Sequence, residues 1–232
     1  FDTLRRDVDN KRMMEGLDAF NQQALAMLTS SRLANALNLD KEDPKLRDRY
    51  GRGNAKKQAD GSHKLLDDFL MARRLVEAGA RCVSLAFSRW DWHGGNFKRA
   101  RQDMPMLDQA LTALVEDLHN RGMEKDVVVV CWGEFGRTPD NGIRGGIKYG
   151  RDHNPKAMNI WLAGGGVKAG HTIGATDEIG ATAVEVVHPL RDFHVTLLHL
   201  LGLDDNKLTY FHAGRYKQLS QFGGELIPEL IA

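Results

Sequence analysis

Three short polar blocks carry the side chains that can do chemistry, and two of these blocks supply a candidate metal site. Asp91 and His93 stand two positions apart within 89–96, and His153 stands in the glycine- and proline-bounded block 150–155. In an extended segment, side chains two positions apart point the same way, so Asp91 and His93 can bind one ion. With His153 they form one carboxylate and two imidazoles, a set that suits zinc, manganese or iron with an open coordination position. The alternative is a polar loop in which hydrogen-bonded histidines have only a structural role.

The third block, 133–139, directly follows a run of valines and contains Glu134 and Arg137. Glu134 is a candidate metal ligand or general base. Arg137, together with Arg151 in the second block, is a candidate clamp for an anionic oxygen ligand, because a guanidinium group matches phosphate or sulfate with two parallel hydrogen bonds. We therefore predict catalytic roles for Glu134 and Arg137 and substrate binding by Arg151. A salt bridge between Glu134 and Arg137 that only braces the loop is the alternative.

Residues beside these candidates could support the same site. Asp152 can orient His153 through a hydrogen bond to the imidazole, or it can simply cap the turn. Trp92 and Asn96 are candidate substrate-binding residues, and packing in the protein core explains Trp92 equally well.

The pattern of apolar residues predicts how the blocks are brought together. A strand over 81–87, an amphipathic helix over 104–121 and a strand over 127–132 have the lengths of a β-α-β crossover. Such a crossover makes its two strands parallel, so the polar blocks that follow them open on the same edge of the sheet. We expect a third strand over 158–162 and a helix that starts at Pro189.

The remaining sequence predicts one domain over 1–232, with a mainly helical segment 1–79, an α/β core 80–203 and a tail 204–232. Helices are expected over 15–28, from Ser30 or Ser31 to Leu39, from the Asp43-Pro44 start to Gly51, and from Ser62 to Gly79, with a polar loop over 51–61.

Composition excludes several classes of protein. The 32 basic and 31 acidic residues nearly balance, which gives no reason to expect a nucleic-acid partner or a charged membrane surface. No apolar run approaches the roughly 20 residues of a membrane span. Cys82 and Cys131 lie in apolar runs, which favours buried free thiols over a disulfide. The three glycines at 164–166 favour a tight turn over a phosphate-binding loop, because the spacing of a phosphate loop is missing.

Several blocks resemble, in order and spacing, the bacterial sulfatase-like family catalogued as domain of unknown function 1501. They are W-D-W-H-G at 90–94 with Asn96, L-D-Q-A-L at 107–111, G-E-F-G-R-T-P at 133–139, G-R-D-H at 150–153 and A-G-G-G-V at 163–167. The resemblance covers essentially the whole chain.

That family is similar to the alkaline phosphatase superfamily. The resemblance implies a three-layer α/β/α sandwich with a mostly parallel central sheet and, in active members, a two-metal site that hydrolyses phosphate or sulfate esters. Asp91, His93 and His153 occupy the positions that hold one metal. The second metal relies on an Asp-His pair where this chain has Glu134-Phe135, so the sequence departs from the pattern there.

The resemblance also implies an N-terminal half with an export signal, the first sheet strand and the nucleophile. The chain starts at Phe1, and we expect it to be the C-terminal part of an exported or periplasmic protein. No nucleophile can be named in it.

The leading expectation is a hydrolase that uses a divalent metal, zinc or manganese, to cleave phosphate or sulfate esters of small molecules or polysaccharides. The first alternative is a non-catalytic exported protein that keeps the fold to bind an anionic polysaccharide. The second is a part of the fold in which the polar loops only brace the sheet edge.

Overall fold

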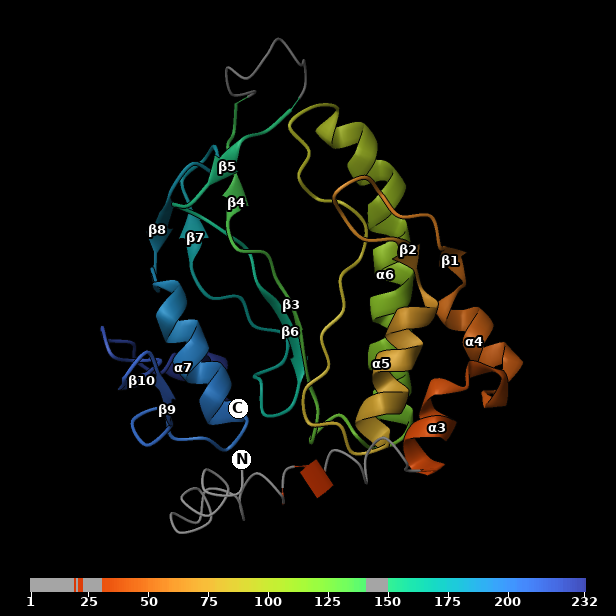
Figure 1. Cartoon of the computed structure of the whole chain (residues 1–232). Coiled ribbons are helices and arrows are strands. Elements are labelled where there is room, and N and C mark those ends of the chain that lie inside the picture. Colours follow the sequence, from red (N-terminus) through yellow and green to blue (C-terminus); the bar gives the residue numbers. More distant parts are fainter. Residues whose placement is uncertain (1–18, 20, 23–30, 141–149) are drawn as a thin grey trace. The chain divides into compact units, whose positions relative to one another are not determined.

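The computed structural model describes residues 19, 21–22, 31–140 and 150–232, and it divides into two compact units, Phe1–Ser88 and Arg89–Ala232 (Figure 1). The helix predicted over 15–28 lies almost entirely outside the described residues. Among the described residues, no helix is long and apolar enough to cross a membrane.

The first unit is mainly helical, as predicted. Its elements are α3 (Ser31–Leu37), the short 3-10 helix η1 (Leu39–Lys41), α4 (Pro44–Tyr50), the strand pair β1 (Gly53–Asn54) and β2 (Lys64–Leu65), and α5 (Asp67–Glu77). The side chain of Asp43 accepts a hydrogen bond of 3.0 Å from the backbone N–H of Lys45, and Gly51 ends the helix at a φ of 90°. The predicted start and stop of this helix are therefore confirmed, and both come from local capping chemistry.

Buried ion pairs hold the helices of this unit together. Glu42 accepts hydrogen bonds from Arg73, whose side chain is 1% exposed, and from Arg74. Arg47 of α4 binds both carboxylate oxygens of Asp67 in α5 at 2.9 Å. Burial raises the pKa of Glu42, but the hydrogen bonds from Arg74 and Arg73 outweigh it, and the pKa lies below its usual value.

The second unit starts with a helix that is longer than predicted. Helix α6 (Asn96–Asn120) begins well before position 104 and contains Pro105. Its buried apolar residues, Ala110, Ala113, Leu114 and Leu118, repeat at three- and four-residue steps. The first two turns carry polar residues without this period, and an interior proline usually ends a helix, so the sequence pattern missed them.

The named strands of the second unit form antiparallel pairs within the part of the chain that the structure describes. Strand β3 (Val128–Cys131) lies beside β6 (Trp161–Gly164), with Val128 opposite Gly164. The other pairs are β4 (Gly136–Arg137) with β5 (His153–Asn154), β7 (Ala175–Thr176) with β8 (Ala183–Glu185), and β9 (Thr209–His212) with β10 (Arg215–Gln218). The strand predicted over 127–132 is confirmed, and the third strand forms slightly later than 158–162.

The strand predicted over 81–87 is absent, since residues 82–87 belong to no strand in the structure. The parallel pairing of 81–87 with 127–132 stays a prediction, because the two segments belong to different units. Phe87 packs against Phe69, and the backbone of Ser88 bonds to the carbonyl of His63 at 2.8 Å and to the N–H of Ser62 at 2.9 Å. Phe87 is therefore the buried apolar residue by which this segment packs in the first unit. The three-layer fold stays a prediction.

The core of the second unit forms where α7 (Leu190–Leu200) meets the chain end. Phe193 clusters with Ile227 and Leu230, and Val130 of β3 and Leu162 of β6 pack against them. The C-terminal tail, predicted as loop with short elements, contains the β9–β10 hairpin and the 3-10 helix η2 (Pro228–Leu230). The predicted helix after Pro189 is confirmed.

Two smaller predictions can also be checked. Residues 164–166 form a turn in which all three glycines have positive φ, at 76°, 49° and 82°, so the tight turn is confirmed. Cys82 and Cys131 are free thiols, as predicted. Cys82 is exposed, however, because its segment is not a buried strand.

Candidate metal centre

A small antiparallel ribbon positions His153. In the β4–β5 pair, Arg137 lies opposite His153. The ribbon continues through Thr138, whose backbone N–H donates to the carbonyl of Asp152 at 2.9 Å and whose hydroxyl accepts from the N–H of Asp152 at 2.9 Å. The second and third polar blocks are therefore joined by local strand pairing.

A close backbone approach brings the loop 91–94 to this ribbon. A Cβ added at Gly150 would lie 1.7 Å from the carbonyl oxygen of His93, so only glycine fits at this contact. Gly136 makes a similar approach, because a Cβ there would lie 1.9 Å from the carbonyl oxygen of Ala157. The glycines of the two blocks thus have a packing role that their positions alone do not reveal.

The three predicted metal ligands meet at one carboxylate oxygen. Asp91 Oδ1 lies 2.8 Å from Nε2 of His153 and 2.9 Å from Nε2 of His93. The ligand atoms of Asp91, His93 and His153 all lie within 4.8 Å of one another. The structure therefore brings together the residues that the sequence predicted, although they belong to segments separated by 62 positions.

Arg137 completes the contacts around Asp91. Its Nη2 donates to the carbonyl of Trp90 at 2.7 Å and approaches Asp91 Oδ1 at 3.2 Å, and its Nη1 donates to the carbonyl of Arg151 at 3.4 Å. The hydrogen bond with His153 is the main reason that the pKa of Asp91 falls to about 2, with Arg137 and His93 also lowering it against burial. Asp91 is therefore ionised at any physiological pH.

Neighbouring groups fix the orientation of the two imidazoles. Asp152 Oδ1 lies 3.4 Å from Nδ1 of His93 and accepts the backbone N–H of His153 at 2.9 Å. The ring of Phe135 packs on His153 at 4.2 Å between centroids with a tilt of 30°. Asp152 thus contacts the imidazole of His93, and its hydrogen bond with His153 is to the backbone N–H of that residue. Phe135 was not predicted, and its place inside the G-E-F-G-R-T-P block was its only signal in the sequence.

The other predicted site residues are not among the three clustered ligands. Glu134 is exposed and is not part of any ligand cluster among the described residues, and Asn96 starts helix α6. Arg151 donates from Nη1 to the carbonyl of Gly150 at 2.7 Å, and its guanidinium lies 4.9 Å from the ring centre of Phe97. The roles predicted for Glu134, Asn96 and Arg151 therefore stay predictions.

The ligand set fits a divalent transition metal. Two ligands of a tetrahedral zinc ion at about 2.1 Å from the metal lie about 3.4 Å apart. The two contacts of 2.8 and 2.9 Å at Asp91 are somewhat shorter than this, and small side-chain movements would open them to the required spacing. With its proton on Nδ1, facing Asp152, His93 presents the lone pair of Nε2 to the same point as Asp91. Three ligands leave a coordination position open, which is typical of catalytic sites.

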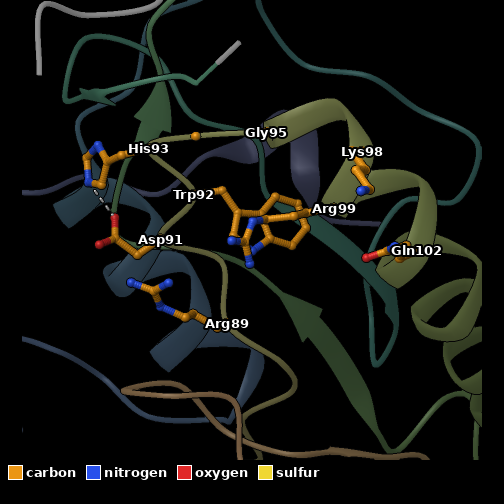
Figure 2. A pocket seen from close by; sticks show the side chains of 9 residues that line it. Arg89, Asp91, Trp92, His93, Gly95, Lys98, Arg99 and Gln102 are labelled. Atoms are coloured by element: carbon orange, nitrogen blue, oxygen red, sulfur yellow. Dashed lines mark ion pairs between the residues drawn. The ribbon is translucent and has the colours of Figure 1, made fainter. Parts of the chain in front are cut away.

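A pocket of about 590 Å³ adjoins this centre, and Asp91, His93 and Trp92 form part of its wall (Figure 2). Trp92 is 5% exposed and its ring stacks at 4.9 Å from that of Trp90. Trp92 is thus buried and at the same time lines the pocket.

Comparisons with known proteins bear on the family. No curated protein and no solved structure matches the chain. A family model described as "Protein of unknown function (DUF1501)" matches residues 2–231. The chain therefore belongs to the DUF1501 family, as its sequence blocks predicted.

Proposed function

We propose that this protein is a divalent-metal-dependent hydrolase of phosphate or sulfate esters. The observation that carries the proposal is the meeting of two imidazole Nε2 atoms at one carboxylate oxygen of Asp91. One carboxylate and two imidazoles with an open position are a common set in metal-dependent hydrolases. The resemblance to sulfatase-like proteins and to alkaline phosphatases supports ester hydrolysis as the reaction.

In this proposal Asp91, His93 and His153 hold the metal, which would act as a Lewis acid on an oxygen of the ester. The other residues act by positioning these ligands. Arg137 holds Asp91 in place through its contacts of 3.2 Å to the carboxylate and 2.7 Å to the carbonyl of Trp90. Because these contacts occupy Nη2, Arg137 is better suited to brace the centre than to clamp a substrate.

Asp152 and Phe135 complete the positioning. The carboxylate of Asp152 favours the His93 tautomer whose Nε2 binds a metal, and Phe135 restricts rotation of the His153 ring. Glu134 lies apart from this cluster and has no role in the proposal. The three-layer α/β/α fold and an exported location belong to the same proposal, and both rest on the family resemblance.

The test is ester hydrolysis by the purified protein loaded with zinc or manganese. We expect turnover of at least one aryl phosphate or aryl sulfate, and loss of this turnover when a chelator removes the metal. Asp91→Ala should lower kcat/KM by at least about 100-fold, which is equivalent to about 2.7 kcal/mol of transition-state stabilisation. Asp108→Ala is the matched control, because Asp108 is an exposed carboxylate on α6 away from the centre. Metal binding without turnover of any ester would favour the non-catalytic binding protein instead.

A further inference from the structure

The pocket beside the metal centre has a strongly cationic wall. On one side stand Asp91 and His93, and on the other the first two turns of α6 present Lys98, Arg99 and Gln102 (Figure 2). Arg89 also lines the pocket, and Asp91 is the only acidic residue among its lining residues within the described part of the chain. A bound metal would neutralise that single carboxylate.

The start of α6 departs from the usual pattern of helix N-termini. Acidic residues are favoured in the first turn, because the unpaired N–H groups give this end a partial positive charge. Helix α6 has no acidic residue in its first turn and no side-chain cap, and Lys98 and Arg99 follow its first residues instead. Among the described residues, neither Lys98 nor Arg99 is paired with a carboxylate. The first turn of α6 therefore adds no negative charge of its own to this side of the pocket.

The spacing of these side chains suits one ligand. Lys98 and Gln102 are four positions apart and Arg99 and Gln102 three, so all three lie on one side of the helix. Gly95, which precedes the helix in a left-handed conformation with φ of 61°, has open space where a side chain would stand. The pocket is thus open beside Gly95, where a guanidinium, an ammonium and an amide also line it.

We infer that this pocket binds a second anionic group of the substrate, so that the preferred substrates are esters with at least two anionic groups. The inference rests on the proposed function, because the same loop that supplies Asp91 and His93 forms the wall facing Lys98 and Arg99. One anionic group is the reacting ester at the metal centre. The other, a sulfate, phosphate or carboxylate, is held by Lys98, Arg99 and the start of α6.

Isothermal titration calorimetry on the purified, metal-loaded protein tests the inference. It compares ligands that carry one anionic group with ligands that carry two. The ligands are a monosulfated and a disulfated form of one disaccharide, and a hexose monophosphate and bisphosphate. The disaccharide pair represents polysaccharide fragments and the hexose pair represents small metabolites, so the two arms distinguish the sources. We expect the member with two anionic groups to bind about 10-fold more tightly than its partner with one, in at least one of the two pairs.

The variant Lys98→Ala/Arg99→Ala should lose this preference, and its matched control, Arg101→Ala/Lys125→Ala, should keep it. The control removes two exposed cations of the same unit that do not line the pocket. Gln102→Glu, which places a negative charge on the same helix side, should also weaken binding of the ligand that carries two anionic groups. The inference would be overturned if ligands with one and with two anionic groups bound equally tightly. It would also be overturned if the control variant lost the preference for two anionic groups as much as Lys98→Ala/Arg99→Ala does.

The outcomes separate this inference from the proposed function. Turnover of simple monoanionic esters without any effect of Lys98→Ala/Arg99→Ala would leave the hydrolase proposal standing and reject the pocket. The opposite result is a protein that hydrolyses no ester and still binds ligands with two anionic groups more tightly, in a way that depends on Lys98 and Arg99. That result would support the anion-binding role of the pocket and reject the hydrolase proposal.

Discussion

The most direct test of the metal centre is the substitution His153→Ala. His153 supplies one of three ligand atoms, at 2.8 Å from Asp91 Oδ1. Zinc sites with four ligands bind with roughly 10–16 kcal/mol, so one ligand is worth about 3 kcal/mol, or a loss of roughly 100-fold or more in affinity. Asp91 and His93 remain in the variant and should retain weak binding.

The same substitution should leave the metal-free protein folded. The side chains of His153 and Asp91 are 40% and 44% exposed, and an ion pair of such exposure contributes less than about 1 kcal/mol to stability. Removing His153 also raises the pKa of Asp91 from about 2 toward its usual value, which still leaves the carboxylate ionised at neutral pH. A lower affinity would therefore report the lost ligand and not a protonated Asp91 or an unfolded chain.

Titration calorimetry with zinc or manganese on the metal-free protein measures the effect, and thermal unfolding of the same samples checks the fold. His171→Ala is the matched control, because His171 is an exposed histidine of the same unit outside the ligand cluster. If His153→Ala binds metal as tightly as the wild type, or if the control loses as much affinity, the assignment of His153 as a ligand is wrong.

Three further predictions concern the fold and pH dependence. Glu42→Gln should lower the free energy of unfolding at pH 7 by roughly 1–3 kcal/mol in urea denaturation, because it removes the carboxylate that Arg73 and Arg74 share, while the buried Arg73 keeps its ion pair with Glu77. Folding lowers the pKa of Glu42 from 4.5, so the wild type should lose this part of its stability as the pH falls below about 4.5. If the free energy of unfolding of Glu42→Gln falls equally steeply with acidification, the reasoning is wrong. Gly150→Ala should weaken metal binding at least about 10-fold in calorimetry, because the added Cβ would lie 1.7 Å from the carbonyl oxygen of His93 and must push the ligand loop away. Gly133→Ala is the control and should leave metal binding unchanged, because the nearest atom to its added Cβ lies at 3.6 Å. Asp91→Asn should bind metal more weakly at both pH 7 and pH 5, because Asp91 stays ionised, and able to bind the ion, down to about pH 2; equal affinity of the variant and the wild type in calorimetry would refute this.

The sequence by itself determined the features that depend on local spacing. The i, i+2 arrangement of Asp91 and His93, the capping of α4 by Asp43 and the strand of valines at 127–132 were all predicted and are observed. Each of these follows from a few neighbouring residues, whose backbone preferences and apolar period act over one or two turns or one strand.

Only the tertiary structure decided what joins the site. The sequence predicted that parallel strands would bring the polar blocks to one edge, but a short antiparallel ribbon, with Arg137 opposite His153, positions the second imidazole. The bracing role of Arg137 and the ring of Phe135 on His153 also depend on contacts between segments. Strand pairing is set by which partner satisfies the backbone and the side chains of both segments, so a residue pattern that is correct for one strand does not reveal its neighbour. The residues of the centre were therefore readable in the sequence, and the geometry that makes them one site was not.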